Sequence, residues 1–119
     1  MVVAAVETVV GAGTRELVET FAALGDPVRQ LIVERLTEGD ATVNELAALF
    51  PISLQAVSRH IKVLEAAGVV SRSRIAQSRP VHLEAAALIR TADWLDVHRA
   101  RLESRYERLD AVLDELKET

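Results

Sequence analysis

The sequence contains no cysteine and very few aromatic residues. The absence of cysteine among the 119 residues excludes disulfide bonds, thiolate metal sites and thiol-based redox switches. The only aromatic side chains are Phe21, Phe50, Trp94 and Tyr106. A core must therefore be built from Leu, Val, Ile and Ala, which favours packed helices over a β-sandwich.

Long hydrophobic runs are also missing. The N-terminal stretch "MVVAAVETVVGAG" is apolar, but Glu7 interrupts it and no basic segment precedes it, so neither a secretory signal nor a membrane span is predicted. We expect an arm over residues 1–13, followed by a single domain over residues 14–119 that is long enough to bury its own core. We expect a cytoplasmic protein with no membrane partner.

Negative charge predominates in the chain, whose net charge is −4, but one segment is basic. Residues 1–52 carry three Lys or Arg against eight Asp or Glu, and residues 83–119 carry six against nine. Residues 53–82 carry five Lys or Arg against Glu65 alone, a local net charge of +4. Such asymmetry is typical of a surface that binds a polyanion, although a solvated basic face would give the same count.

Two helices are predicted before residue 40. Residues 14–24 form the first. The second begins with Asp26 as N-cap and Pro27 at the first helical position, and Gly39 ends it. Its apolar stripe is expected to consist of Leu31, Ile32 and Leu36.

The next two helices are separated by a short turn. Thr42 and Glu45 form a capping box at the start of "TVNELAALF", which Pro51 ends. Ser53 then caps a longer helix that runs to about residue 67, where Gly68 terminates it. A short helix, a turn and a longer helix are typical of a helix-turn-helix.

After Gly68 the sequence changes to the alternating pattern of strands. "VVSRSRI" and "SRPVHL" predict a β-hairpin, with "AQS" between them, although the turn lacks glycine. Pro80 cannot donate to a strand ladder, so we expect a short hairpin with Pro80 on an edge.

The helix over residues 54–66 has one apolar and one polar, basic face. On a helical wheel Leu54, Val57, Ile61 and Leu64 fall within an arc of about 80°. The opposite arc, of about 100°, holds Gln55, Ser58, Arg59 and Lys62, side chains that can reach base edges in a major groove. The predicted DNA-contacting residues are Ser53, Gln55, Ser58, Arg59, His60 and Lys62, with Arg72, Arg74 and Arg79 of the hairpin beside phosphates or the minor groove.

The chain resembles the ArsR family of winged-helix repressors over roughly residues 15–117. The resemblance rests on "ALGDPVR" and on "ISLQAVSRHIKVLEAAGVV", in which the cap, helix, glycine stop and strand occur in register. It is most similar to the cysteine-free branch of that family. The resemblance implies a winged helix-turn-helix fold, mainly α with a small β-hairpin, and a transcriptional repressor that binds a double-stranded DNA operator.

Many members of that family are metal sensors, but this sequence does not match their sites. The first helix of the helix-turn-helix reads "NELAALF" and has no thiol. Asp96 and His98 match the first half of a site that other members carry in the last helix, whereas Leu109 and Val112 occupy the later ligand positions. Two ligands do not make a tetrahedral site, so we expect no metal and no cofactor, with His98 a partly buried residue near a dimer interface.

The position of His60 leaves two alternatives open. It lies about 60° from Val57 on the wheel, so it either packs locally or contacts the DNA backbone, as the resemblance suggests. Ser58 and His60 point in roughly opposite directions and cannot form a catalytic dyad. We predict no enzymatic activity.

The final segment predicts a long helix over about residues 91–117, capped by Thr91. A leucine recurs every seven residues in it, which is typical of a helix that pairs with another. We expect homodimerisation through the N- and C-terminal helices, although the stripe could also pack on its own domain. The predicted dimer interface comprises Leu17, Phe21, Leu95, Leu102, Tyr106, Leu109, Leu113 and Leu116.

These features predict a sequence-specific DNA-binding transcriptional regulator that recognises an inverted repeat as a homodimer. Two alternatives remain. One is a metal- or small-ligand-responsive sensor of the same fold. The other is a winged-helix protein-interaction module, whose exposed face should be apolar rather than basic.

Overall fold

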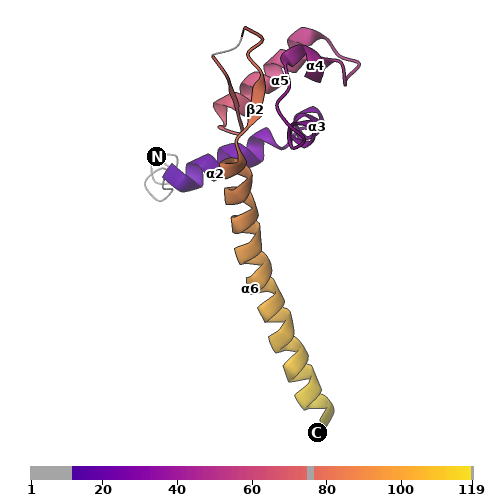
Figure 1. The fold of residues 1–119 in the computed structure, drawn as a ribbon. Helices are drawn as coiled ribbons and strands as arrows, with labels where there is room; N and C mark the ends of the chain where they lie inside the picture. Colours follow the sequence, from indigo (N-terminus) through magenta and orange to yellow (C-terminus); the bar gives the residue numbers. More distant parts are fainter. Residues whose placement is uncertain (1–11, 75–76, 119) are drawn as a thin grey trace, which may run out of the picture.

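The computed structural model describes residues 12–74 and 77–118. Within these residues the order of elements is α2 (Ala12–Ala23), α3 (Pro27–Leu36), α4 (Val43–Ala47), α5 (Leu54–Ala66), β1 (Val70–Arg72), β2 (Val81–Leu83) and α6 (Ala85–Glu118). Figure 1 shows α2 to α5 and the hairpin gathered into one domain, from which α6 projects. The predicted fold, mainly α with a small hairpin, is confirmed. Most of the predicted arm lies outside the described residues.

Three of the four predicted N-caps are confirmed. Asp26 Oδ2 accepts hydrogen bonds from the backbone N–H groups of Val28 and Arg29 at 2.9 and 3.1 Å. The hydroxyl of Thr42 accepts from the N–H of Glu45, and that of Ser53 accepts from the N–H of Ala56, both at 3.1 Å. These local bonds satisfy helix N–H groups that have no partner within the helix, and they fix where α3, α4 and α5 begin.

The core lies where α3, α4 and α5 meet the hairpin. Its largest fully buried aliphatic side chains are Ile32, Leu46, Val57, Ile61, Leu64, Val69, Val70 and Val81. The predicted stripe of α3 was partly wrong, because Leu31 is 51% exposed and Val33 is buried in its place. Leu31 instead borders a surface hollow with Leu49 and Phe50.

The hairpin is as short as predicted. β1 and β2 pair antiparallel with Val70 opposite Leu83 and Arg72 opposite Val81. Pro80 lies just before β2, and its carbonyl still accepts a bond from the N–H of Ser73 at 3.3 Å. Arg79 adopts a left-handed backbone conformation, with φ of 45°, although that region favours glycine. The predicted turn comprises residues 76–78, of which residue 76 lies outside the described residues, as does residue 75 at the end of the first predicted strand.

The last helix begins earlier than predicted. α6 starts at Ala85, so Thr91 lies inside the helix rather than at its cap. The Thr91 side chain is buried, and its hydroxyl donates to the carbonyl of Ala87 at 2.8 Å. This bond satisfies the hydroxyl within the helix, which lets α6 continue through a residue type that often caps helices.

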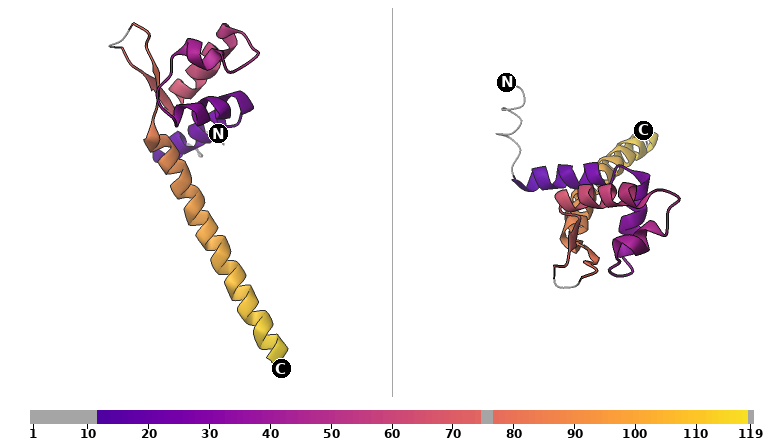
Figure 2. Two further views of the ribbon diagram at one scale, coloured as in Figure 1. Left: turned by 45° about the vertical axis from the view of Figure 1, so that its right-hand side comes forward. Right: turned by 90° about the horizontal axis from the view of Figure 1, so that it is seen from above.

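The molecule is elongated because of α6. Its extents are 72 × 38 × 25 Å, and the 34 residues of α6 span about 51 Å. Figure 2 shows the hairpin and the α4–α5 pair at the end of the molecule opposite the C-terminus of α6. None of the helices in the described part of the chain has the length and apolarity needed to cross a membrane.

Candidate nucleic-acid interface

Helix α5 presents a polar, basic face away from the core. Val57, Ile61 and Leu64 are at most 1% exposed and anchor the other side of the helix. Gln55, Arg59 and Lys62 are exposed, while Ser58 is half-buried at the edge of this face. For these residues, the apolar and polar faces predicted from the helical wheel are therefore present.

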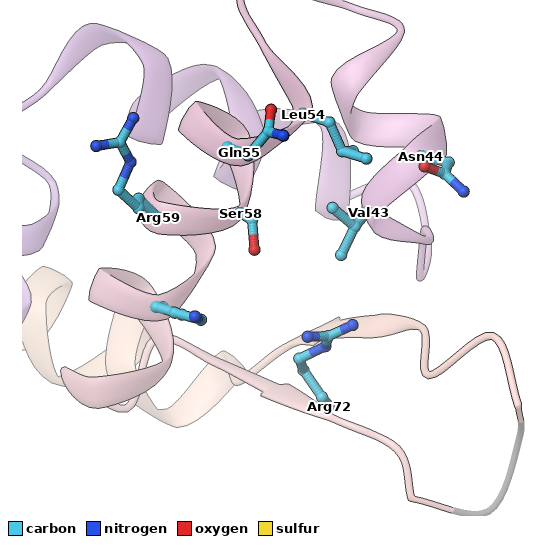
Figure 3. A pocket seen from close by; sticks show the side chains of 8 residues that line it. Val43, Asn44, Leu54, Gln55, Ser58, Arg59 and Arg72 are labelled. Atoms are coloured by element: carbon cyan, nitrogen blue, oxygen red, sulfur yellow. The ribbon is translucent and has the colours of Figure 1, made fainter.

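A surface hollow of about 440 Å³ lies between α4, α5 and the hairpin. It brings together four of the predicted DNA-contacting residues of α5 with one from β1. It is lined by Val43, Asn44, Leu54, Gln55, Ser58, Arg59, Lys62 and Arg72. In Figure 3 the guanidinium of Arg72 points from the hairpin toward the space below α4, and the hydroxyl of Ser58 points into the same space.

Three of these lining residues were not predicted from the sequence. Val43 and Asn44 come from the first turn of α4, and Leu54 from the first turn of α5. Leu54 was expected in the core, but it is 46% exposed. Its place at the end of the apolar arc, about 40° from Ser58, is the signal that could have identified it.

The three hairpin arginines differ in their surroundings. Arg72 is half-buried, and its Nη2 lies 3.5 Å from the carbonyl oxygen of Arg79, which ties it to the opposite side of the hairpin. Its buried Nε finds no hydrogen-bond partner among the described residues. Arg74 and Arg79 are exposed. Arg72 is thus the hairpin cation that the fold holds beside α5.

His60 contacts the N-terminus of α3. Its Nδ1 lies 3.2 Å from Nη1 of Arg29 and 3.7 Å from Oδ2 of Asp26. The backbone N–H of Arg29, followed by the nearby His60 and the N–H of Val28, lowers the pKa of the Asp26 carboxyl below its ordinary value. The local-packing alternative for His60 is therefore present, and a contact with the DNA backbone stays a prediction.

A second surface follows α2 and α6. The rings of Phe21 and Trp94 meet edge to face with centroids 5.5 Å apart, and Glu16 pairs with Arg90 at 3.8 Å. Every residue from Ala92 to Glu118 is exposed. The six predicted interface residues of α6 are 46–65% exposed, namely Leu95, Leu102, Tyr106, Leu109, Leu113 and Leu116. Leu17 and Phe21 of α2 are half-buried.

The residues of the half-matched metal site have protein partners. Oδ1 of Asp96 lies 3.1 Å from Nη2 of Arg99. His98 stacks on Trp94 with ring centroids 4.1 Å apart, and its Nδ1 lies 2.8 Å from the Trp94 carbonyl oxygen. Within the described residues, no group of three or more His, Cys, Asp or Glu is placed to hold a metal ion.

A helix-turn-helix followed by a hairpin, with basic side chains on the second helix and the hairpin, defines a winged-helix DNA-binding protein.

The helix-turn-helix domain family matches residues 24–72. The chain is 38% identical over 89 residues to the HTH-type transcriptional regulator Rv2034 of Mycobacterium tuberculosis, covering 75% of this chain and 83% of the relative. It is 33% identical over 75 residues to the transcriptional repressor SdpR of Bacillus subtilis, covering 63% and 83%.

Solved structures agree with these relatives. An ArsR-like transcriptional regulator from Rhodococcus sp. RHA1 superposes with a TM-score of 0.71 at 30% identity, covering 82% of this chain and 92% of the other. The homodimeric winged helix-turn-helix domain of Mb0332 from Mycobacterium bovis shares the fold at 21% identity, with a TM-score of 0.58 and coverage of 76% and 84%. The chain belongs to the ArsR family of winged helix-turn-helix transcriptional regulators.

Proposed function

We propose that this protein is a repressor that binds an inverted-repeat DNA operator as a homodimer. The observation that carries the proposal is the hollow beside α5, where Gln55, Arg59, Lys62 and Arg72 converge although the chain as a whole is acidic. An α-helix fits the major groove, and Arg and Gln can each form two hydrogen bonds with a base edge. The exposed Arg74 and Arg79 lie on the same hairpin, where phosphates of the flanking backbone would pass.

Dimerisation is supported by the apolar stripe of α6. The leucines of this stripe are about half exposed, and they lie on the part of α6 that projects from the domain. If the stripe packed on its own domain instead, these leucines would be buried. A second copy would cover them and exclude water from the stripe. A two-fold dimer would place two α5 helices about 34 Å apart on one face of the DNA, which is why an inverted repeat is proposed.

Repression is proposed because a dimer bound where another protein must bind would exclude that protein from the DNA. The relative SdpR is named a transcriptional repressor, which supports this reading. We also propose that the protein acts in the cytoplasm and has no enzymatic activity. On this proposal, binding needs neither metal nor cofactor.

Selection from a pool of random duplexes tests the proposal. Purified protein should enrich a sequence with two-fold symmetry, bind it about 10³-fold or more tightly than a scrambled duplex, and sediment as two copies per duplex. If the enriched sequences show no common motif, or if binding does not weaken with added salt, the protein is not a sequence-specific DNA-binding regulator. A protein-interaction module of the same fold would give that result.

A further inference from the structure

Leu54 is an exposed leucine in the middle of a basic face. It is the first residue of α5, and it is 46% exposed, whereas the next large apolar residue of the helix, Val57, is fully buried. The core side of α5 therefore begins one turn after Leu54. A single half-exposed leucine is common on protein surfaces, so its role depends on the side chains that surround it.

Val43 lies across the hollow from Leu54. Thr42 caps α4, which places Val43 in the first turn of that helix. Figure 3 shows the side chains of Val43 and Leu54 facing one another where α4 and α5 approach, close to Ser58. The two form an apolar spot whose neighbours in the same hollow are Gln55, Arg59, Lys62 and Arg72.

The surrounding charge identifies the occupant. The hollow is lined by three cationic side chains together with Gln55 and Ser58. Such a lining is suited to a polyanion, not to an apolar peptide or lipid. In the major groove the base edges offer polar donors and acceptors, and the one apolar group is the C5-methyl of thymine. An apolar spot on a DNA-reading face is therefore matched by a thymine methyl.

We propose that Leu54 and Val43 bind the 5-methyl group of one thymine in each half of the operator, and that Leu54 is a specificity-determining residue. The proposal rests on the proposed DNA-binding function. On this proposal the first residue of α5 recognises an apolar group of the DNA, which the hydrogen-bonding residues of the helix do not. Gln55 and Arg59 read donors and acceptors, whereas Leu54 distinguishes thymine from cytosine and from uracil by shape and apolar contact.

Replacing thymine by deoxyuridine tests the proposal, because this change removes the methyl group and keeps every hydrogen-bonding group. Each thymine of the duplex selected from the random pool is replaced in turn. At one thymine per half-site the wild-type affinity should fall about fourfold, the factor expected for one buried methyl group. Leu54→Ala should weaken binding to the thymine duplex and bind both duplexes equally.

Two further variants complete the experiment. Val43→Ala should reduce discrimination at the same thymine, whereas Leu49→Ala should leave it unchanged, since Leu49 is 53% exposed beside a different hollow. Thermal unfolding of each variant checks that it is folded.

Two results would overturn the proposal. One is a wild-type protein that binds the selected duplex equally well with any thymine replaced. The other is a methyl effect that survives unchanged in Leu54→Ala. Both are distinct from failure of the proposed function, in which no duplex sequence is preferred.

Discussion

The indole of Trp94 meets the ring of Phe21 edge to face, with centroids 5.5 Å apart and an angle of 74° between the planes. This contact joins α2 to α6 close to the point where α6 leaves the domain. Thr91, one turn before Trp94, is still buried, and every residue from Ala92 to Glu118 is exposed. The aromatic pair thus lies at the boundary between the part of α6 that packs on its own domain and the exposed part that we propose to meet a second copy.

Dimerisation should fail when charged residues replace leucines of the α6 stripe, which consists of Leu95, Leu102, Leu109 and Leu116. In the double variant Leu102→Glu with Leu109→Glu, two carboxylates would have to be buried without partners, which costs several kcal/mol. We expect a folded monomer by sedimentation and a loss of operator binding. A matched control is Ala100→Glu with Ala111→Glu, because both alanines lie on the opposite face of α6 and are exposed. A stripe variant that still sediments as a dimer would show that the interface lies elsewhere.

Metal should not change operator binding. Asp96 is paired with Arg99, and His98 is stacked on Trp94, so neither side chain is placed with further ligands. Affinity measured with chelator should equal affinity measured with added zinc. A release of about tenfold by stoichiometric zinc would contradict this expectation, and Asp96→Asn with His98→Ala would then show whether these residues are responsible.

Arg59 and Arg74 should affect binding in different ways. A guanidinium that spans two acceptors of guanine contributes about 1–3 kcal/mol of discrimination, so Arg59→Ala should reduce the preference for the operator over a scrambled duplex. Arg74→Ala should weaken both duplexes alike and reduce the salt slope by about one per contact. Salt titrations of both variants on both duplexes give these quantities. An equal loss on the two duplexes for Arg59→Ala would make Arg59 a phosphate contact instead.

The stability of the hairpin end should depend on pH through His82. Its Nδ1 lies 2.8 Å from Oδ1 of Asp40, and this hydrogen bond and charge, with Glu84 contributing less, raise the pKa of His82 above its ordinary value of 6.5. A raised pKa means that the stabilisation is fully present below pH 6.5 and is lost as pH rises through the higher value.

Removing the carboxylate should remove that dependence. The melting temperature of Asp40→Asn should lie below that of the wild type in acidic buffer, and the difference should shrink as the pH rises above 6.5 and through the raised pKa. Asp110→Asn, on the exposed part of α6, is the control and should show no such trend. If the melting temperature of Asp40→Asn fell further below that of the wild type as the pH rose, the result would contradict a stabilising pair between Asp40 and protonated His82.

Local sequence determined where α3, α4 and α5 begin and which face of α5 is buried. Asp26, Thr42 and Ser53 bond to N–H groups two or three residues away, so their effect does not depend on distant parts of the chain. The apolar period of α5 likewise marks Val57 and Ile61 as core. The hairpin and most of the basic face were predicted from equally local patterns, whereas the family was predicted from the resemblance of two sequence motifs.

Only the tertiary structure decided what lies at the edges of these elements. The wheel places Leu54 beside Val57, but no core element covers the first turn of α5, so Leu54 faces the hollow. The same holds for Leu31, which no element covers. His60 meets Arg29 from 31 positions away, and Arg72 is held beside α5 by a hairpin that sequence spacing does not position. Burial depends on which element packs opposite a residue, and the order of residues along the chain does not contain that information.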